Sequence, residues 1–174
     1  MFIEDFYGLP HDVPFINVDT HEYTPLWVQE ILIRDQADTD PFAQKAHQEY
    51  ASFGNTVLGQ VQSESSEDHD EAKECLSKLG EPPETRLGYS PQSHKGKGIS
   101  DGYGHSIFES LQEDLSQLLD PAVGLQFSEL PCFVPGIDKD RTSDLTTSII
   151  CDTLIDYTRH MIEVYPEFTA AGHK

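Results

Sequence analysis

The segment from Asp40 to Val61 constrains the fold most, because it carries one continuous apolar stripe at helical spacing. Asp40 can cap the start of a helix, and Pro41 suits the first helical position, where a missing N–H costs nothing. A face of this length must be buried against other elements, so we predict a core helix here. Its apolar positions recur every three or four residues: Phe42, Ala46, Tyr50, Phe53, Val57 and Val61.

Three further segments show the same periodicity and predict three more helices. The first is a shorter helix that Ser66 caps and Gly80 ends, since glycine suits a helix C-terminus. The second covers residues 103–119, up to the Asp-Pro pair that stops it. The third is a long helix over residues 143–164 near the end of the chain.

Three short apolar segments predict strands: residues 14–19, 26–33 and 130–134. For residues 26–33 a short helical turn is the alternative, and Pro131 places the last strand at a sheet edge or a strand start. The predicted fold class is therefore α+β (mixed α/β) and helix-rich, with about four helices packed with a small sheet of two to four strands. We expect a single domain over residues 1–174, with mobile loops at 63–70 and 86–104.

The charge of the chain narrows the choice of partners. Eleven basic residues face 31 acidic ones, which gives a formal net charge of −20. Such a field repels nucleic-acid phosphates unless basic residues cluster locally, and it disfavours anionic membranes. The chain is either an ordinary acidic protein or one whose acidic surface docks a basic protein partner, as an inhibitor that imitates DNA does.

No membrane partner is expected, because no apolar run approaches the ~18 residues that a membrane span needs. The N-terminus carries acids where a signal peptide carries basic residues. We therefore expect a cytoplasmic protein.

The polar stretch from Asp138 to Asp144 is the first candidate site, since it joins a predicted strand to the N-terminus of the last helix. A helix start presents free N–H groups and a positive dipole end. Asp138, Asp140 and Asp144 could converge on a divalent cation such as Mg²⁺, with Arg141 and Ser143 on a phosphate. Asp140, Arg141 and Asp144 would then form a catalytic set. In the alternative, Thr142 or Ser143 caps the helix, Asp144 complements its dipole and Arg141 pairs with an acid.

The glycine-rich segment from Arg86 to Gly104 is the second candidate. Lys95 and Lys97 lie among its glycines, and backbone N–H groups of such a loop can cradle a phosphate. Together with Arg86 they form the best local candidate for binding an anion. The Walker pattern is absent, because no Gly-Lys-Ser/Thr follows a strand, and a plain surface loop is the alternative.

Four motifs follow one another along the chain: residues 79–90 (LGEPPETRLGYS), the Gly96-Lys97-Gly98 tripeptide, residues 133–147 (FVPGIDKDRTSDLTT) and residues 154–158 (LIDYT). In this order they resemble a family of uncharacterised bacterial proteins found scattered in variable genomic regions. The members continue into a second half, so the chain resembles their N-terminal half only. The resemblance implies a shared fold and names no reaction.

The chain departs from the family pattern at two places. Gln29-Glu30 stands where the family has Asp-Pro, and Asp138 stands where it has Gly. The second departure implies that Asp138 is not a ligand shared with the family. The candidate site residues are therefore the polar residues that follow it: Asp140, Arg141, Ser143 and Asp144.

Three function hypotheses follow. The first is a metal-dependent domain or half-domain, of bacterial or mobile-element origin, that processes a phosphate-bearing substrate such as nucleic acid with Mg²⁺ as cofactor. The second is a non-catalytic acidic regulator that binds a basic protein. The third is a folded remnant without a task.

Overall fold

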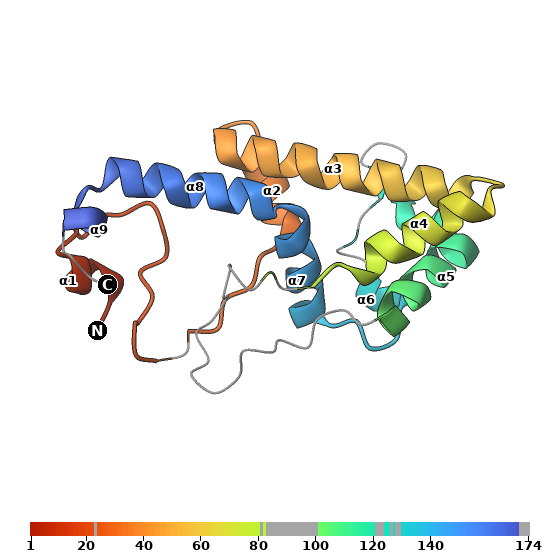
Figure 1. Ribbon diagram of the computed structural model, residues 1–174, viewed down its shortest axis with the longest axis horizontal. Helices are drawn as coiled ribbons and strands as arrows, with labels where there is room; N and C mark the ends of the chain where they lie inside the picture. The colour runs from red at the N-terminus through yellow and green to blue at the C-terminus, as the bar shows by residue number, and fades with distance from the viewer. Residues whose placement is uncertain are drawn as a thin grey trace.

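The computed structural model is an elongated assembly of helices (Figure 1). It describes residues 1–22, 24–80, 82, 101–120, 124–125, 127 and 130–170. Within these ranges the helices are α1 (Ile3–Tyr7), α2 (Glu30–Gln36), α3 (Pro41–Gln62), α4 (Ser66–Ser77), α5 (Asp101–Leu118), α6 (Leu130–Phe133), α7 (Lys139–Ile149), α8 (Cys151–Val164) and α9 (Glu167–Ala170). Two strands of two residues each, β1 (Leu119–Asp120) and β2 (Gly124–Leu125), pair antiparallel.

The predicted α+β fold class is wrong, because none of the three predicted strands is a strand. Residues 130–133 form α6. Residues 26–29 have no regular secondary structure, and α2 begins at Glu30 after its extended cap residue Gln29. Residues 14–19 contribute one isolated bridge, between Asp19 and Phe2. The ladder of β1 and β2 lies elsewhere and is too short to form a layer of the core.

The strand predictions failed because they rest on short apolar runs. In a run of this length the hydrophobic periodicity is the same for a buried strand and for a buried helical turn. Leu130 in α6 is buried, and so are Val134 and Ile137 in the link that follows it. An apolar run of this kind is therefore buried here without any strand. In the other run, Ile31 and Leu32 are exposed, whereas the acidic Glu30 is buried.

The helix predicted from Asp40 to Val61 is confirmed as α3. The Asp40 side chain caps it by accepting the backbone N–H of Ala43 at 2.7 Å. The predicted stripe faces the core through Tyr50, Val57 and Val61, which are at most 5% exposed. α3 is therefore the central long helix of the fold, and α2, α4, α5, α7 and α8 all pack against it (Figure 1).

The two middle helices are also present, with shifted ends. α4 begins one residue after its cap Ser65, whose hydroxyl accepts the N–H of Glu67 at 3.2 Å. The loop predicted at 63–70 is shorter in the structure: residues 63–65 are non-helical, and residues 66–70 belong to α4. α5 begins at Asp101, so the last four residues of the loop predicted at 86–104 form its first turn, and the rest of that loop lies outside the described residues.

The long helix predicted over residues 143–164 is two helices that meet at an angle (Figure 1). The break falls at Ile150, whose side chain is 2% exposed and whose backbone has φ −97° and ψ 18°. No glycine or proline marks the break, but five hydroxyl residues and two isoleucines from 142 to 150 have poor helix propensity.

The core lies where α3, α4, α5, α6 and α7 meet. α4 and α5 approach so closely that a Cβ on Gly104 would lie 2.6 Å from the backbone nitrogen of Ser77. Glycine is therefore required at this crossing. Leu76, Leu111 and Leu145 are fully buried at the centre of the cluster. No helix of the described residues is long and apolar enough to cross a membrane.

Leu111→Ala tests the core. Leu111 is 0% exposed, so the truncation removes buried contacts and leaves a cavity. The free energy of unfolding in urea is expected to fall by about 2–5 kcal/mol. The control Leu32→Ala, at a side chain that is 57% exposed, is expected to change it by less than about 0.5 kcal/mol. Equal losses in the two variants would contradict this core.

Candidate functional site

The polar stretch at 138–144 forms the first turns of α7, four residues earlier than the predicted helix start. Asp138 is the cap, and its carboxylate accepts the backbone N–H of Arg141 at 3.0 Å. Thr142 and Ser143, which the sequence offered as caps, lie inside the helix. The stretch follows the helical turn α6 and a short link, so it is not a strand-to-helix junction.

Asp140 and Ser143 hold the extended segment that precedes α2. The indole N–H of Trp27 donates to Asp140 Oδ1 at 2.5 Å, and the backbone N–H of Val28 donates to Ser143 Oγ at 2.8 Å. Lys139 adds a cation–π contact, with Nζ 3.9 Å from the centroid of the Trp27 ring. An extended segment without a strand partner needs acceptors for its N–H groups, and Ser143 supplies one.

Arg141 holds the turn before α7 against α5. Its guanidinium donates to the carbonyl oxygen of Gly136 at 2.6 Å and lies 4.5 Å from the centroid of the Tyr103 ring. Gly136 has a φ of +86°, which favours glycine, and a Cβ there would lie 3.2 Å from the Tyr103 ring. Asp138 lies 3.7 Å from the same guanidinium, so Arg141 is engaged within the fold.

The predicted catalytic, metal and phosphate roles stay predictions. Asp140 and Asp144 lie one turn apart on α7, on the same side of the helix. Among the described residues, no three His, Cys, Asp or Glu side chains are grouped so that they could hold a metal ion. The anion-binding candidates Arg86, Lys95 and Lys97 lie outside the described residues.

Ser143→Ala tests the contact between α7 and the segment that contains Trp27. The change leaves the part-buried Val28 N–H without its acceptor, so unfolding is expected to require about 1–3 kcal/mol less free energy. Trp27 is the sole tryptophan, and its emission is expected to move to longer wavelength as the segment loosens. The control is Ser52→Ala, at an exposed position on α3, which should leave both readouts unchanged. An unchanged emission in Ser143→Ala would contradict the contact.

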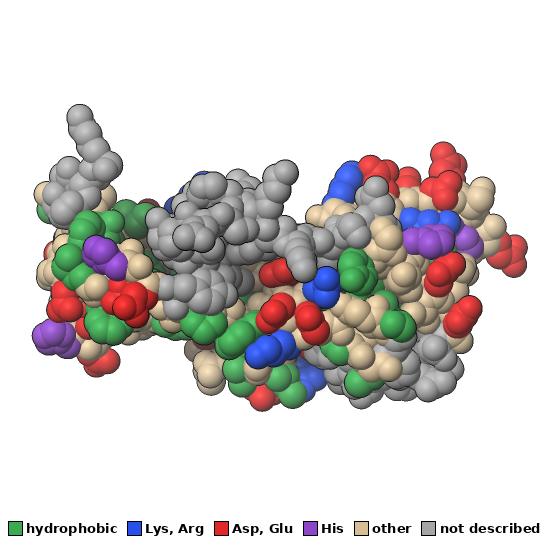
Figure 2. All heavy atoms as spheres, turned by 90° about the horizontal axis from the view of Figure 1, so that it is seen from below, with side chains coloured by type: hydrophobic (Ala, Val, Ile, Leu, Met, Phe, Trp, Pro, Cys, Tyr) green, Lys and Arg blue, Asp and Glu red, His purple; other side chains and the backbone are tan. Residues whose placement is uncertain are grey.

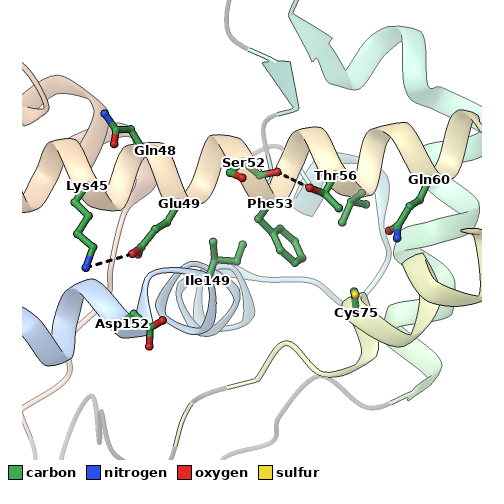
Figure 3. Close-up of a pocket in the computed structure, with 11 residues that line it drawn as sticks. Lys45, Gln48, Glu49, Ser52, Phe53, Thr56, Gln60, Cys75, Ile149 and Asp152 are labelled. Carbon is green, nitrogen blue, oxygen red and sulfur yellow. Dashed lines mark hydrogen bonds and ion pairs between the residues drawn. The ribbon is translucent and has the colours of Figure 1, made fainter.

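A groove of about 570 Å³ follows one side of α3 (Figure 3). α3 supplies most of its lining, and the opposite side comes from Ile149 and Asp152 near the α7–α8 junction and from Cys75 on α4. The α3 residues recur every three or four positions, so they form one face that overlaps the apolar stripe at Phe53 and Val57: Lys45, Gln48, Glu49, Ser52, Phe53, Thr56, Val57 and Gln60.

One end of the groove carries a small network of charged side chains. Lys45 Nζ lies 2.6 Å from Asp156 Oδ2 on α8 and 3.7 Å from Glu49 Oε1. Thr153 Oγ1 donates to the other oxygen of Glu49 at 2.9 Å. The hydrogen bond from Lys45 holds the pKa of Asp156 below its ordinary value, and the same bond raises the pKa of Lys45. The network thus ties α8 to α3.

Asp156→Asn tests this network through its pH dependence. A carboxyl group with a lowered folded-state pKa stabilises the fold above its unfolded pKa, and this contribution is lost as pH falls through the folded-state value. The variant is expected to melt at a lower temperature than wild type at pH 7. The difference should vanish on acidification below the ordinary value of 3.8. Since the pair is exposed, the effect is small.

Asp152→Asn is the matched control for this experiment. It removes the same charge from α8. Asp152 acts on Lys45 only through a longer-range attraction, the last of the causes that raise the Lys45 pKa, whereas Asp156 accepts the hydrogen bond. The control therefore measures the general effect of lowering a large negative charge. A pH-independent loss in Asp156→Asn, or an equal loss in both variants, would argue against the Lys45–Asp156 pair.

The groove itself was not predicted from the sequence, although Phe53 and Val57 were predicted as members of the apolar stripe. A signal was present, because Lys45, Ser52, Thr56 and Gln60 form a polar stripe at helical spacing beside the apolar one. Such a polar stripe is typical of any solvated helix face. Only the residues that α4, α7 and α8 place opposite α3 distinguish a groove from an ordinary exposed face.

A family model described as a domain of unknown function, DUF8370, matches residues 9–166 of the chain. Neither the curated proteins nor the solved structures contain a match.

Proposed function

This chain belongs to the DUF8370 family, and we propose that it is a non-catalytic binding domain whose acidic surface docks a basic protein partner. The observation that supports this proposal is that the lysines and arginines within the described residues are engaged in contacts of the fold. Phosphate binding needs available cations, whereas a basic partner needs unneutralised carboxylates.

Seven lysines and arginines lie within the described residues. Six of them make an ion pair within 4 Å of a carboxylate, and the seventh, Lys139, lies over the ring of Trp27. The six are Arg34, Lys45, Lys73, Lys78, Arg141 and Arg159. A phosphate would have to compete with these carboxylates, and the excess of 20 negative charges remains for a partner.

The end of the molecule formed by α4 and α5 shows this excess most clearly (Figure 2). Among the side chains that the structure describes on these two helices and the turn before them, seven acidic ones are exposed, against Lys73 on α4 and Lys78 directly after it. Both lysines are paired with acids of their own helix. The seven exposed acids are Glu64, Glu67, Asp70, Glu71, Glu74, Glu109 and Glu113.

Binding of a synthetic peptide tests the proposal. The probe is a lysine–leucine peptide of about 15 residues that forms an amphipathic helix, and the control replaces each lysine by glutamate. We expect the lysine peptide alone to bind in isothermal titration calorimetry. Its Kd is expected to rise about tenfold or more between 0.1 M and 1 M salt, as the screening length falls from about 10 Å to about 3 Å. Equal binding of both peptides, or binding that salt does not weaken, would contradict an acidic docking surface.

A magnesium titration separates this proposal from the metal-dependent hypothesis. Coordination of Mg²⁺ by Asp140 would take away the acceptor of the Trp27 indole N–H and so change the Trp27 emission. A non-catalytic binding domain shows no such change at millimolar Mg²⁺. A saturable change in wild type that is lost in Asp140→Asn would favour the metal site instead.

A further inference from the structure

The groove along α3 has the length and shape of a binding site for one peptide segment. It runs from Lys45 to Gln60, which is about 22 Å at the rise of an α-helix. Phe53 and Ile149 point toward each other across its middle (Figure 3). The centre is therefore apolar, and hydroxyl and amide side chains such as Ser52 and Gln48 line its edge.

Acidic side chains lie at both ends of this apolar centre. At the Lys45 end, Glu49 and Asp152 line the groove, and Lys45 itself is turned to Asp156, 2.6 Å away. At the other end the Gln60 amide donates to Glu71 Oε2 at 3.1 Å. A neutral amide leaves the charge of this exposed carboxylate in place, so each end of the groove attracts a cation.

We propose that the groove binds a segment of the basic partner that has an apolar centre flanked by lysine or arginine on both sides. This inference rests on the proposed function and gives it a location and a recognition pattern. Apolar side chains of the segment lie against Phe53 and Ile149. Its flanking cations face Asp152 at one end and Glu71 at the other, which is the helix-in-groove form of peptide recognition.

A second copy of the chain fits this groove less well than a basic segment. It would bring another 20 excess negative charges against the same carboxylates, and like charges brought together oppose association. Charge complementarity thus selects a cationic occupant.

Thiol protection locates the bound segment. Cys75 is exposed and lines the groove, whereas Cys132 is exposed on α6 and does not line it. The lysine–leucine peptide, at about ten times its Kd, is expected to slow maleimide labelling of Cys75 by about tenfold, in proportion to the bound fraction. Labelling of Cys132 should keep its rate. Peptide mapping by mass spectrometry measures both sites in one sample.

A pair of arginine substitutions on α3 provides the matched test. Ser52 is exposed and lines the groove, and Asn55 is exposed three residues later without lining it. Arginine is a good helix former, so both variants are expected to fold. Ser52→Arg places bulk and positive charge in the groove and should weaken peptide binding about tenfold or more. Asn55→Arg adds the same charge and should change the Kd less than about twofold.

An oligolysine with the same number of lysines tests the apolar centre. It keeps the cations but leaves Phe53 and Ile149 uncovered, so we expect it to bind more weakly than the lysine–leucine peptide. Equal affinities would overturn the recognition pattern.

The outcomes separate the two proposals. Suppose that the lysine–leucine peptide binds, that Cys75 stays unprotected and that Ser52→Arg and Asn55→Arg bind the peptide with the same Kd. The groove inference is then wrong, and the acidic docking surface stands. If wild type binds no cationic peptide, both fall. If sedimentation shows a dimer whose formation Ser52→Arg abolishes, a second copy is the occupant and the cationic segment is overturned.

Discussion

The burial of one face of α3 is the constraint on which the rest of the structure depends. Phe127 is fully buried and lies between two members of the α3 stripe, with ring centroids 5.7 Å from Tyr50 and 5.6 Å from Phe53. Burial also raises the pKa of the Tyr50 hydroxyl, so this side chain stays neutral in the core. Because α2, α4, α5, α7 and α8 all contact α3, its orientation sets the position of each.

The first turns of α7 show how polar residues in a promising pattern can have a structural role. Asp138 caps the helix, Asp140 and Ser143 bind the segment around Trp27, and Arg141 joins the preceding turn to Tyr103. Each contact provides a physical reason for a polar side chain at its position.

Electrostatics link the fold to the proposed function. The described cations are mostly paired with neighbouring acids, so they stabilise local structure and leave the excess negative charge exposed. The groove combines this charge with a small apolar area between Phe53 and Ile149. An apolar contact fixes the position of a partner, and the surrounding carboxylates increase its rate of association.

The sequence by itself determined the features that depend on neighbouring residues. The spacing of the α3 stripe and the cap at Asp40 lie within one stretch of chain, so the helix and its buried face could be predicted together. α4 and α5 followed in the same way, and the charge of −20 needed only counting. The groove stripe was also present in the sequence, but without walls it could not be told from a solvated face.

Only the tertiary structure decided what each apolar run and each polar stretch does. Trp27 meets Asp140 across 113 residues and Val28 meets Ser143 across 115, and no local periodicity specifies such a pairing. The same holds for the break at Ile150 and for the helical state of residues 130–133, which are set by what packs against them. Local patterns determine which face of a helix is apolar, whereas the burial of that face against distant segments determines where the helix ends and what its polar residues bind.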